Sequence, residues 1–177
     1  MALMLALLLS EFKNINPKGR FFLDDINPSW LVKYENEIID LCKAGNIYKI
    51  QCDIQSGNSR LLKLMNRYGD ADNLLRVFKR IKEADPNIII GTEVIAGFPT
   101  ETDEEFYDSL EFLRIYGIDF YYIYPYYENQ SIISSKIHPK FSPRVIQKGL
   151  HKSILFFEKN KMSYWIFHLK DKRDIFS

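Results

Sequence analysis

One stretch of the chain, residues 88–102, joins the pattern of a buried strand to a glycine turn and a helix start. Its first part, Ile88–Ala96, is dense in β-branched apolar residues, which is typical of a parallel strand covered on both faces. Gly97 then permits a tight turn or a close backbone approach to a ligand. Thr102 and Glu105 have the spacing of a capping box, so a helix is expected to begin there. In parallel α/β folds, ligands bind where strand ends and helix starts meet.

The remaining sequence alternates strand and helix patterns. Strands are expected at residues 20–26, 47–54, 88–96 and 119–125. Helices are expected to begin after Asn27, after Gly57 and at Asp70 or Asp72, and the helix that follows the central strand is expected to end at Gly117. This β-α-β-α-β-α-β order predicts a parallel sheet. Four strands are too few for a closed eight-stranded barrel, so the fold class is α/β with an open or partial barrel.

The two ends of the chain give weaker patterns. A helix is expected to start at Ser142 and Pro143, and its apolar face would hold Val145, Ile146, Leu150, Ile154 and Phe157. Residues 164–177 are expected to fray. Residues 1–9 are apolar but too short to span a bilayer, and we interpret them as the end of a core helix, with a targeting peptide as the alternative. The predicted organisation is a core at 1–127 and a helical extension with a tail at 128–177.

Composition limits the classes of partner. The formal net charge of +1 over 177 residues argues for neither nucleic acid nor an anionic membrane, although a local basic surface could be diluted in this total. Cys42 and Cys52 are the only cysteines, with no Cys-x-x-Cys motif and no Cys/His cluster. We therefore expect a reducing, cytoplasmic setting, no membrane and no metal site in this chain.

Three blocks of sequence resemble the radical S-adenosylmethionine (SAM) methylthiotransferases. They are Gln55-Ser-Gly-Asn-Ser59, Leu62-Lys-Leu-Met-Asn-Arg67 and Val94-Ile-Ala-Gly-Phe-Pro-Thr-Glu-Thr102. In that family a Gln-Ser-Gly-Ser turn precedes a Leu-x-x-Met-x-Arg helix, and a Gly-Phe-Pro-Gly-Glu-Thr turn follows. The three blocks occur here in the same order, and the resemblance covers about residues 3–150.

The chain also departs from the family pattern. The Cys-x-x-x-Cys-x-x-Cys loop that holds the family's [4Fe–4S] cluster is absent, and so are the patterns of the first two strands. The resemblance therefore implies the C-terminal part of a radical SAM domain. The expected fold is a partial (βα)6 barrel, truncated at its N-terminus, with mostly parallel strands flanked by helices.

The resemblance also implies cofactor-binding residues, each with a structural alternative. Gln55 and Ser56 would bind the ribose or the methionine carboxylate of SAM, or form only a turn with Gly57 in a left-handed conformation. Arg67 would bind that carboxylate, or be an ordinary charge at a helix C-terminus.

Two further residues complete the implied SAM site. Glu93 would bind ribose hydroxyls or the α-amino group, or instead form an ion pair with Arg67 or a lysine, because an unpaired buried carboxylate is costly. Gly97, with Phe98 and Pro99, would shape the adenine wall, or be a tight turn alone.

Other polar and aromatic residues have weaker functional interpretations. Asp24 and Asp25 either face the mouth of the site or lie in a solvated loop. The last expected strand is rich in tyrosine, which either stacks on an RNA base or packs in the fold: Tyr121, Tyr122, Tyr124, Tyr126 and Tyr127. No catalytic residue is assigned.

The implied function is that of a radical SAM enzyme that methylthiolates RNA (tRNA) or protein. Its cofactors would be SAM and, in the complete family member, a [4Fe–4S] cluster. This chain alone would be inactive, because it lacks the cluster cysteines. Two alternatives stay open: the half-domain of a different radical SAM enzyme, and an inert remnant or interaction module.

Overall fold

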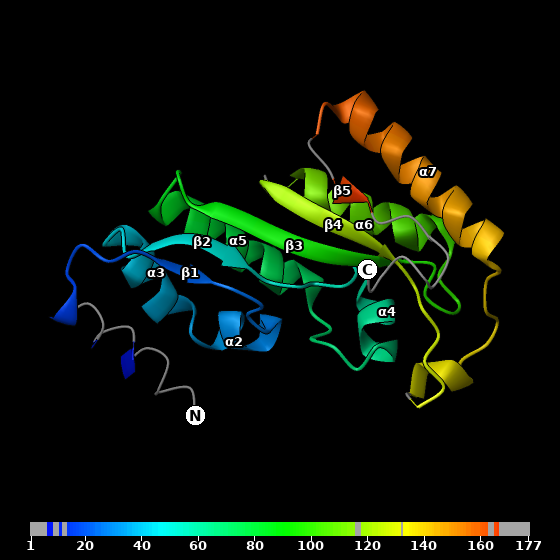
Figure 1. Ribbon diagram of the computed structural model, residues 1–177, viewed down its shortest axis with the longest axis horizontal. Coiled ribbons are helices and arrows are strands. Elements are labelled where there is room, and N and C mark those ends of the chain that lie inside the picture. Colours follow the sequence, from blue (N-terminus) through cyan, green and yellow to red (C-terminus); the bar gives the residue numbers. More distant parts are fainter. Residues whose placement is uncertain are drawn as a thin grey trace, which may run out of the picture.

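The fold is a parallel sheet of five strands in chain order, as a computed structural model shows (Figure 1). The structure describes residues 7–8, 11, 14–115, 118–131 and 133–162, together with the backbone of 165–166. The strands are β1 (Phe21–Leu23), β2 (Ile47–Gln51), β3 (Ile89–Ala96), β4 (Phe120–Pro125) and β5 (Trp165–Ile166). Every neighbouring pair is parallel, so the predicted parallel α/β class is confirmed.

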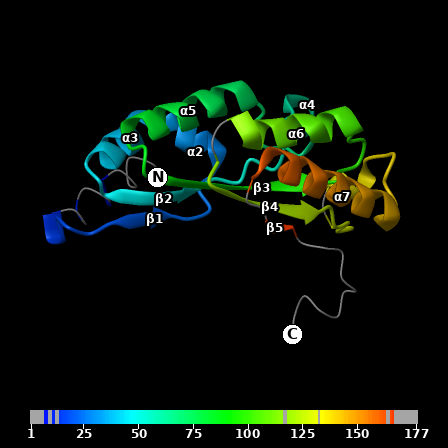
Figure 2. The same ribbon diagram turned by 90° about the horizontal axis from the view of Figure 1, so that it is seen from above.

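The helices cover a single face of this sheet. They are α2 (Pro28–Lys33), α3 (Glu35–Lys43), α4 (Ser59–Leu64), α5 (Ala71–Ala84), α6 (Asp103–Ile115) and α7 (Pro143–Asn160), with a 3₁₀ turn η1 (Ile133–Lys136). Figure 2 shows α2, α3, α4, α5 and α6 on the same side of the strands, and α7 packs beside α6 on β4. The opposite face is the side seen in Figure 1, where it lies in front of α5 and α6.

The central strand divides its side chains between the two faces. Ile90, Thr92, Val94 and Ala96 are buried in the core under the helices, whereas Glu93 alternates with them and is half-buried on the open face. This alternation follows from the two-residue repeat of a strand. A carboxylate therefore stands on the uncovered face of an otherwise apolar strand.

Side-chain caps start the helices where the sequence indicates. The Asn27 side chain accepts a hydrogen bond from the Ser29 N–H at 2.9 Å, and Pro28 occupies the first turn. The predicted capping box is complete, because Glu105 accepts from the Thr102 N–H at 2.9 Å and the Thr102 hydroxyl accepts from the Glu105 N–H at 3.2 Å. Local chemistry thus fixes the helix that follows the central strand.

Some predicted boundaries are wrong. The helix after Asn27 is two helices, α2 and α3, separated at Tyr34. The second strand ends at Gln51 because the chain leaves the sheet and returns only as a single bridge between Gln55 and Val94. Val145 is exposed and does not belong to the buried face of α7. That face is formed by Ile146, Leu150, Phe156 and Phe157.

The C-terminal end of the described chain joins the main core. α7 packs on β4 through Tyr121 and Phe157, whose ring centroids are 4.8 Å apart. β5 corrects the expectation that residues 164–177 only fray, since 165–166 pair in parallel with β4; two residues are too few to give a sequence pattern. The division at residues 127 and 128 stays a prediction.

The structure describes only part of residues 1–9, which were interpreted as the end of a core helix. Leu7 and Leu8 are helical and exposed, while the rest of residues 1–9 lie outside the described part of the chain, as does Gly117. Among the described helices, none has the length and apolar character required to cross a membrane.

Candidate functional site

A pocket lies at the carboxyl ends of β3 and β4. Its volume is about 770 Å³, which is within the usual range for small-molecule sites. Its polar lining includes Gln55, Arg67 and Glu93. Its apolar lining includes Leu64, Met65, Ile95, Phe98, Tyr126 and Tyr127. Three of the five predicted SAM-binding residues therefore share one cavity.

Gln55 is held in place by its backbone. Its N–H donates to the Glu93 carbonyl at 2.9 Å, and its own carbonyl accepts from the Ile95 N–H at 2.9 Å. Its φ of 65° is left-handed, so the predicted left-handed residue of this turn is Gln55 and not Gly57. Backbone pairing with the central strand leaves the Gln55 side chain as part of the pocket wall.

Ser56 and Gly57 face α6. Ser56 is fully buried, and its hydroxyl lies 3.1 Å from the Ser109 hydroxyl and accepts from the Asn58 N–H at 3.1 Å. A Cβ at Gly57 would come within 2.8 Å of the Ser109 Cα, so glycine is needed for close approach. These two residues fasten the turn to α6, and neither lines the pocket.

Arg67 reaches the pocket from the segment after α4. Asn66 is left-handed, with φ of 54°, and the Arg67 N–H donates to the Leu62 carbonyl at 2.8 Å. The Arg67 side chain is exposed and has no hydrogen bond or ion pair with any described residue. Its guanidinium is therefore available to an anionic group in the cavity.

Glu93 stands among polar groups and other acids. Its carboxylate accepts from the Gln51 side-chain amide at 3.2 Å and from the Tyr124 hydroxyl. Burial and the nearby charge of Asp25 raise the pKa of Glu93. Within the described residues it forms no ion pair with Arg67 or a lysine, and the two charges line the same cavity.

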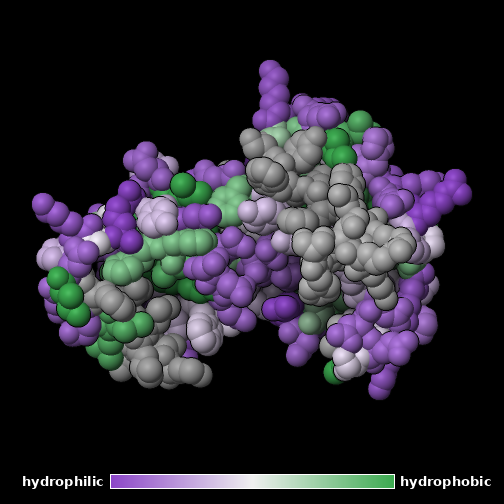
Figure 3. Space-filling view, viewed as in Figure 1, coloured by the Kyte–Doolittle hydropathy of each residue, from purple (hydrophilic) through white to green (hydrophobic). Residues whose placement is uncertain are grey.

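Two further carboxylates lie beside Glu93: Asp25, predicted to face either the mouth of the site or a solvated loop, and Asp53, which was not predicted as a site residue. Asp53, just past β2, shares a hydrogen bond with Asp25, which follows β1. Burial, this hydrogen bond and the charge of Glu93 raise the pKa of Asp53 to about 7. In Figure 3 hydrophilic side chains gather at the middle of this face of the sheet. In the sequence, the position of these acids just after two successive strands was the feature that could have predicted them as neighbours of the site.

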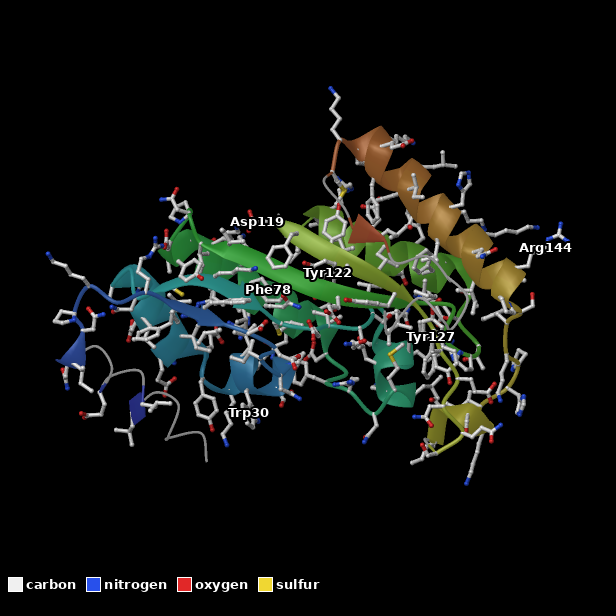
Figure 4. The ribbon with its side chains drawn as sticks, viewed as in Figure 1. Trp30, Phe78, Asp119, Tyr122, Tyr127 and Arg144 are labelled. Atoms are coloured by element: carbon white, nitrogen blue, oxygen red, sulfur yellow. The ribbon has the colours of Figure 1, made fainter. Side chains whose placement is uncertain are left out.

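Aromatic rings form another part of the pocket. Phe98 and Tyr126 meet edge to face, with centroids 5.4 Å apart and an interplanar angle of 77°. Tyr122 projects from the open face of β4, and Tyr127 lies past the carboxyl end of that strand (Figure 4). Tyr121, in contrast, is buried under α7. The tyrosine-rich strand thus divides between packing and the open side.

Gly97 forms a tight turn beside a smaller cavity of about 50 Å³. Its φ is 81°, and a Cβ there would come within 2.6 Å of Ile146 of α7. The Gly97 N–H donates to the buried carboxyl of Glu101 at 2.6 Å. Gly97 does not line the large pocket, although the next residue, Phe98, does.

The cysteines are unsuited to hold a cluster. Cys42 and Cys52 are both buried. Burial raises the pKa of Cys42 to about 12 and that of Cys52 well above its ordinary value, so both thiols are protonated at neutral pH. In the described ranges, no three His, Cys, Asp or Glu side chains are grouped to bind a metal ion. The described residues therefore do not fit a [4Fe–4S] cluster.

Comparisons with known proteins agree on one family. A family model described as "Radical SAM superfamily" matches residues 3–113. The chain is 32% identical over 82% of its length to tRNA-2-methylthio-N(6)-dimethylallyladenosine synthase of Bacillus subtilis. It is 36% identical over 61% of its length to threonylcarbamoyladenosine tRNA methylthiotransferase MtaB of Aquifex aeolicus. It spans 28% of the length of each of these relatives.

A solved structure supports the fold. Coproporphyrinogen III oxidase (HemN) of Escherichia coli, described as a radical SAM enzyme, superposes with a TM-score of 0.72. The match covers 90% of this chain and 37% of that chain at 17% sequence identity, so it concerns architecture alone.

Proposed function

The chain belongs to the Radical SAM superfamily, and on that basis we propose that its pocket binds S-adenosylmethionine in an enzyme that methylthiolates RNA. The observation that carries the proposal is the pair of opposite, mutually unpaired charges in this cavity, Arg67 and Glu93, with Gln55 beside them. SAM has a carboxylate, a cationic ammonium and sulfonium, and an apolar base. The cavity offers a partner for each.

The residues fit SAM by their chemistry. Arg67 would pair with the methionine carboxylate, because a planar guanidinium makes paired hydrogen bonds to that group. Glu93 would accept from the ammonium group or the ribose hydroxyls, and Gln55 would donate to or accept from the same polar part. Phe98 and Tyr126 would cover the adenine. Ser56 and Gly97 would act by holding the turns that place Gln55 and Phe98.

In a complete protein that also supplies a one-electron reductant, SAM would be the source of the radical that abstracts hydrogen from the substrate. The residues of this chain would bind and orient SAM, and the aromatic wall would exclude water from it. The thiolates of a reducing cluster are not among the residues described here, and catalysis is proposed only for a complete protein that contains them.

Names of the relatives favour RNA over protein as the substrate. Both curated relatives described above are named for tRNA modification. Accessible tyrosines on the open side, Tyr122 and Tyr127, offer surfaces on which an unpaired base could stack. A tRNA substrate would agree with a cytoplasmic location.

Calorimetric titration of the chain with SAM tests the pocket. Arg67→Ala should weaken binding by roughly 1.5–3 kcal/mol, the scale of a hydrogen bond to a charged group. Arg114→Ala is the matched control, because Arg114 is a half-exposed arginine that pairs with Glu111 on α6, away from this pocket. Equal SAM affinity of Arg67→Ala and wild type would contradict the assignment.

A further inference from the structure

Positive charge is concentrated on one helix at the edge of the site. α7 contains four Lys or Arg residues and one acid, a net charge of +3. The rest of the chain has 20 Lys or Arg and 22 Asp or Glu, a net charge of −2. The overall charge of +1 thus conceals a basic helix on a mildly acidic body.

Two of these cations, Arg144 and Lys148, form a polar stripe with Gln147 and His151 along the exposed side of α7. Arg144, Gln147, Lys148 and His151 recur at helical spacing and are all exposed. We call these four residues the α7 stripe. None of the four side chains has a hydrogen bond or ion pair to any other residue that the structure describes, whereas Lys152 beside them is paired with Asp103. The stripe is therefore a set of free donors and not a network within the protein.

The stripe begins next to the pocket. Ile146, in the first turns of α7, packs on Gly97, and Phe98 after it lines the pocket. Figure 4 shows the Arg144 side chain extending away from the body at this end of α7, and Figure 3 shows hydrophilic side chains over the same end. A ligand that enters the pocket and continues outward along α7 would meet these donors.

We propose that the α7 stripe binds the phosphate backbone of the RNA whose base stacks on the accessible tyrosines beside the pocket. This inference rests on the proposed function. Among the described residues that line the pocket, Arg67 is the one cation, and it is assigned to the SAM carboxylate, while Glu93 and the nearby Asp53 are acids; the phosphates of an RNA would therefore be bound outside the pocket. Lys and Arg on a neighbouring surface are the groups that bind nucleic-acid backbones.

An anionic membrane fits the stripe less well than RNA does. A membrane-surface helix inserts an apolar face into the lipid. The apolar face of α7 is already used, because Ile146, Leu150 and Phe157 are buried in the protein. Only the polar side is left for a partner.

RNA binding by the 177-residue chain, measured by fluorescence anisotropy with a labelled stem-loop RNA, tests the proposal. In Arg144→Ala/Lys148→Ala, affinity should fall about tenfold or more at 0.1 M salt, and the slope of log K against log salt should become shallower by about 1.4–1.8, for two lost phosphate contacts. Lys43→Ala/Lys79→Ala is the matched control, because it removes the same charge from exposed sites on α3 and α5.

Each outcome decides the proposal. Loss of affinity and of salt slope in the α7 variant, with the control close to wild type, supports it. Equal losses in both variants, or an unchanged α7 variant, overturn it. Preferential, stripe-dependent binding to anionic lipid vesicles also overturns it. SAM calorimetry on the wild type and on the α7 variant separates the two proposals. If both bind SAM and the variant binds RNA as well as the wild type does, only the proposal for the α7 stripe is wrong. If RNA binding depends on the stripe but the wild type does not bind SAM, the proposed function is wrong.

Discussion

Glu101 is a buried acid whose ionisation should control stability between pH 5 and 8. Its side chain is 7% exposed. One carboxyl oxygen accepts the Gly97 N–H at 2.6 Å, and the other, Oε1, is buried with no hydrogen-bond partner. Arg60, the nearby cation, is already bound to Glu105 through two hydrogen bonds. Glu101 is thus buried without full compensation for a negative charge.

Desolvation raises the pKa of Glu101 from an ordinary 4.5 to about 8. The folded protein therefore retains a proton that the unfolded chain loses above pH 4.5. The stability contributed by this group is fully present below pH 4.5 and is lost as pH rises through about 8. At about 1.4 kcal/mol per pH unit, this interval sets an upper limit of about 5 kcal/mol.

Glu101→Gln should remove this pH dependence, because an amide keeps the acceptor for Gly97 and carries no charge. We expect the free energy of unfolding of the variant, relative to wild type, to rise by about 2–4 kcal/mol between pH 5 and 8.5. Urea unfolding followed by circular dichroism at both pH values measures the difference. Glu104→Gln, an exposed neighbour on α6, should show little change. Parallel pH profiles for wild type and Glu101→Gln would refute the reasoning, since Glu101 would then be ionised in the folded state throughout.

Two further predictions concern the turn and the pocket. Gly97→Ala should cost about 2–4 kcal/mol of unfolding free energy, because it adds a clash with Ile146 at 2.6 Å to the strain of a positive φ. Gly45→Ala, at φ 71° with nothing within 4 Å, should cost only about 1 kcal/mol, so equal losses in chemical denaturation would exclude the clash. SAM affinity should rise as pH increases through about 7, because the pKa of Asp53, raised to about 7, leaves this acid partly protonated there and a cationic ligand favours its ionised form. Calorimetry at pH 6 and 8 measures this change, and equal affinities would contradict it.

The elements around the central strand were predictable because their causes are local. The run Ile88–Ala96, the turn at Gly97 and the capping box at Thr102 each act within a few residues, and β3 and α6 form as expected. The break between α2 and α3 lies at Tyr34, where no glycine or proline in the sequence indicates the end of a helix. The edge strand β5 depends on pairing with β4 and on no pattern of its own.

The grouping of site residues was predictable for a topological reason. Gln55 bridges to β3 at Val94, next to Glu93, and the segment after α4 adds Arg67, so the three residues line one cavity at the carboxyl ends of β3 and β4 although they come from three segments. Of the two acids beside Glu93, Asp25 was predicted as one that could face the mouth of the site, whereas Asp53 was not predicted. Both lie close to Glu93 because β1, β2 and β3 are neighbours, and Asp53 follows its strand in what resembles an ordinary polar loop.

The direction in which a side chain points required the tertiary structure. Gln55 and Ser56 are adjacent in sequence, but Gln55 lines the pocket and Ser56 bonds Ser109 of α6. Likewise Gly97 is packed against α7 while Phe98 lines the pocket. Within each motif, one residue thus faces the cavity and its neighbour secures the turn. A substitution at Ser56 would therefore change the affinity for a ligand indirectly, because it would displace the neighbouring Gln55.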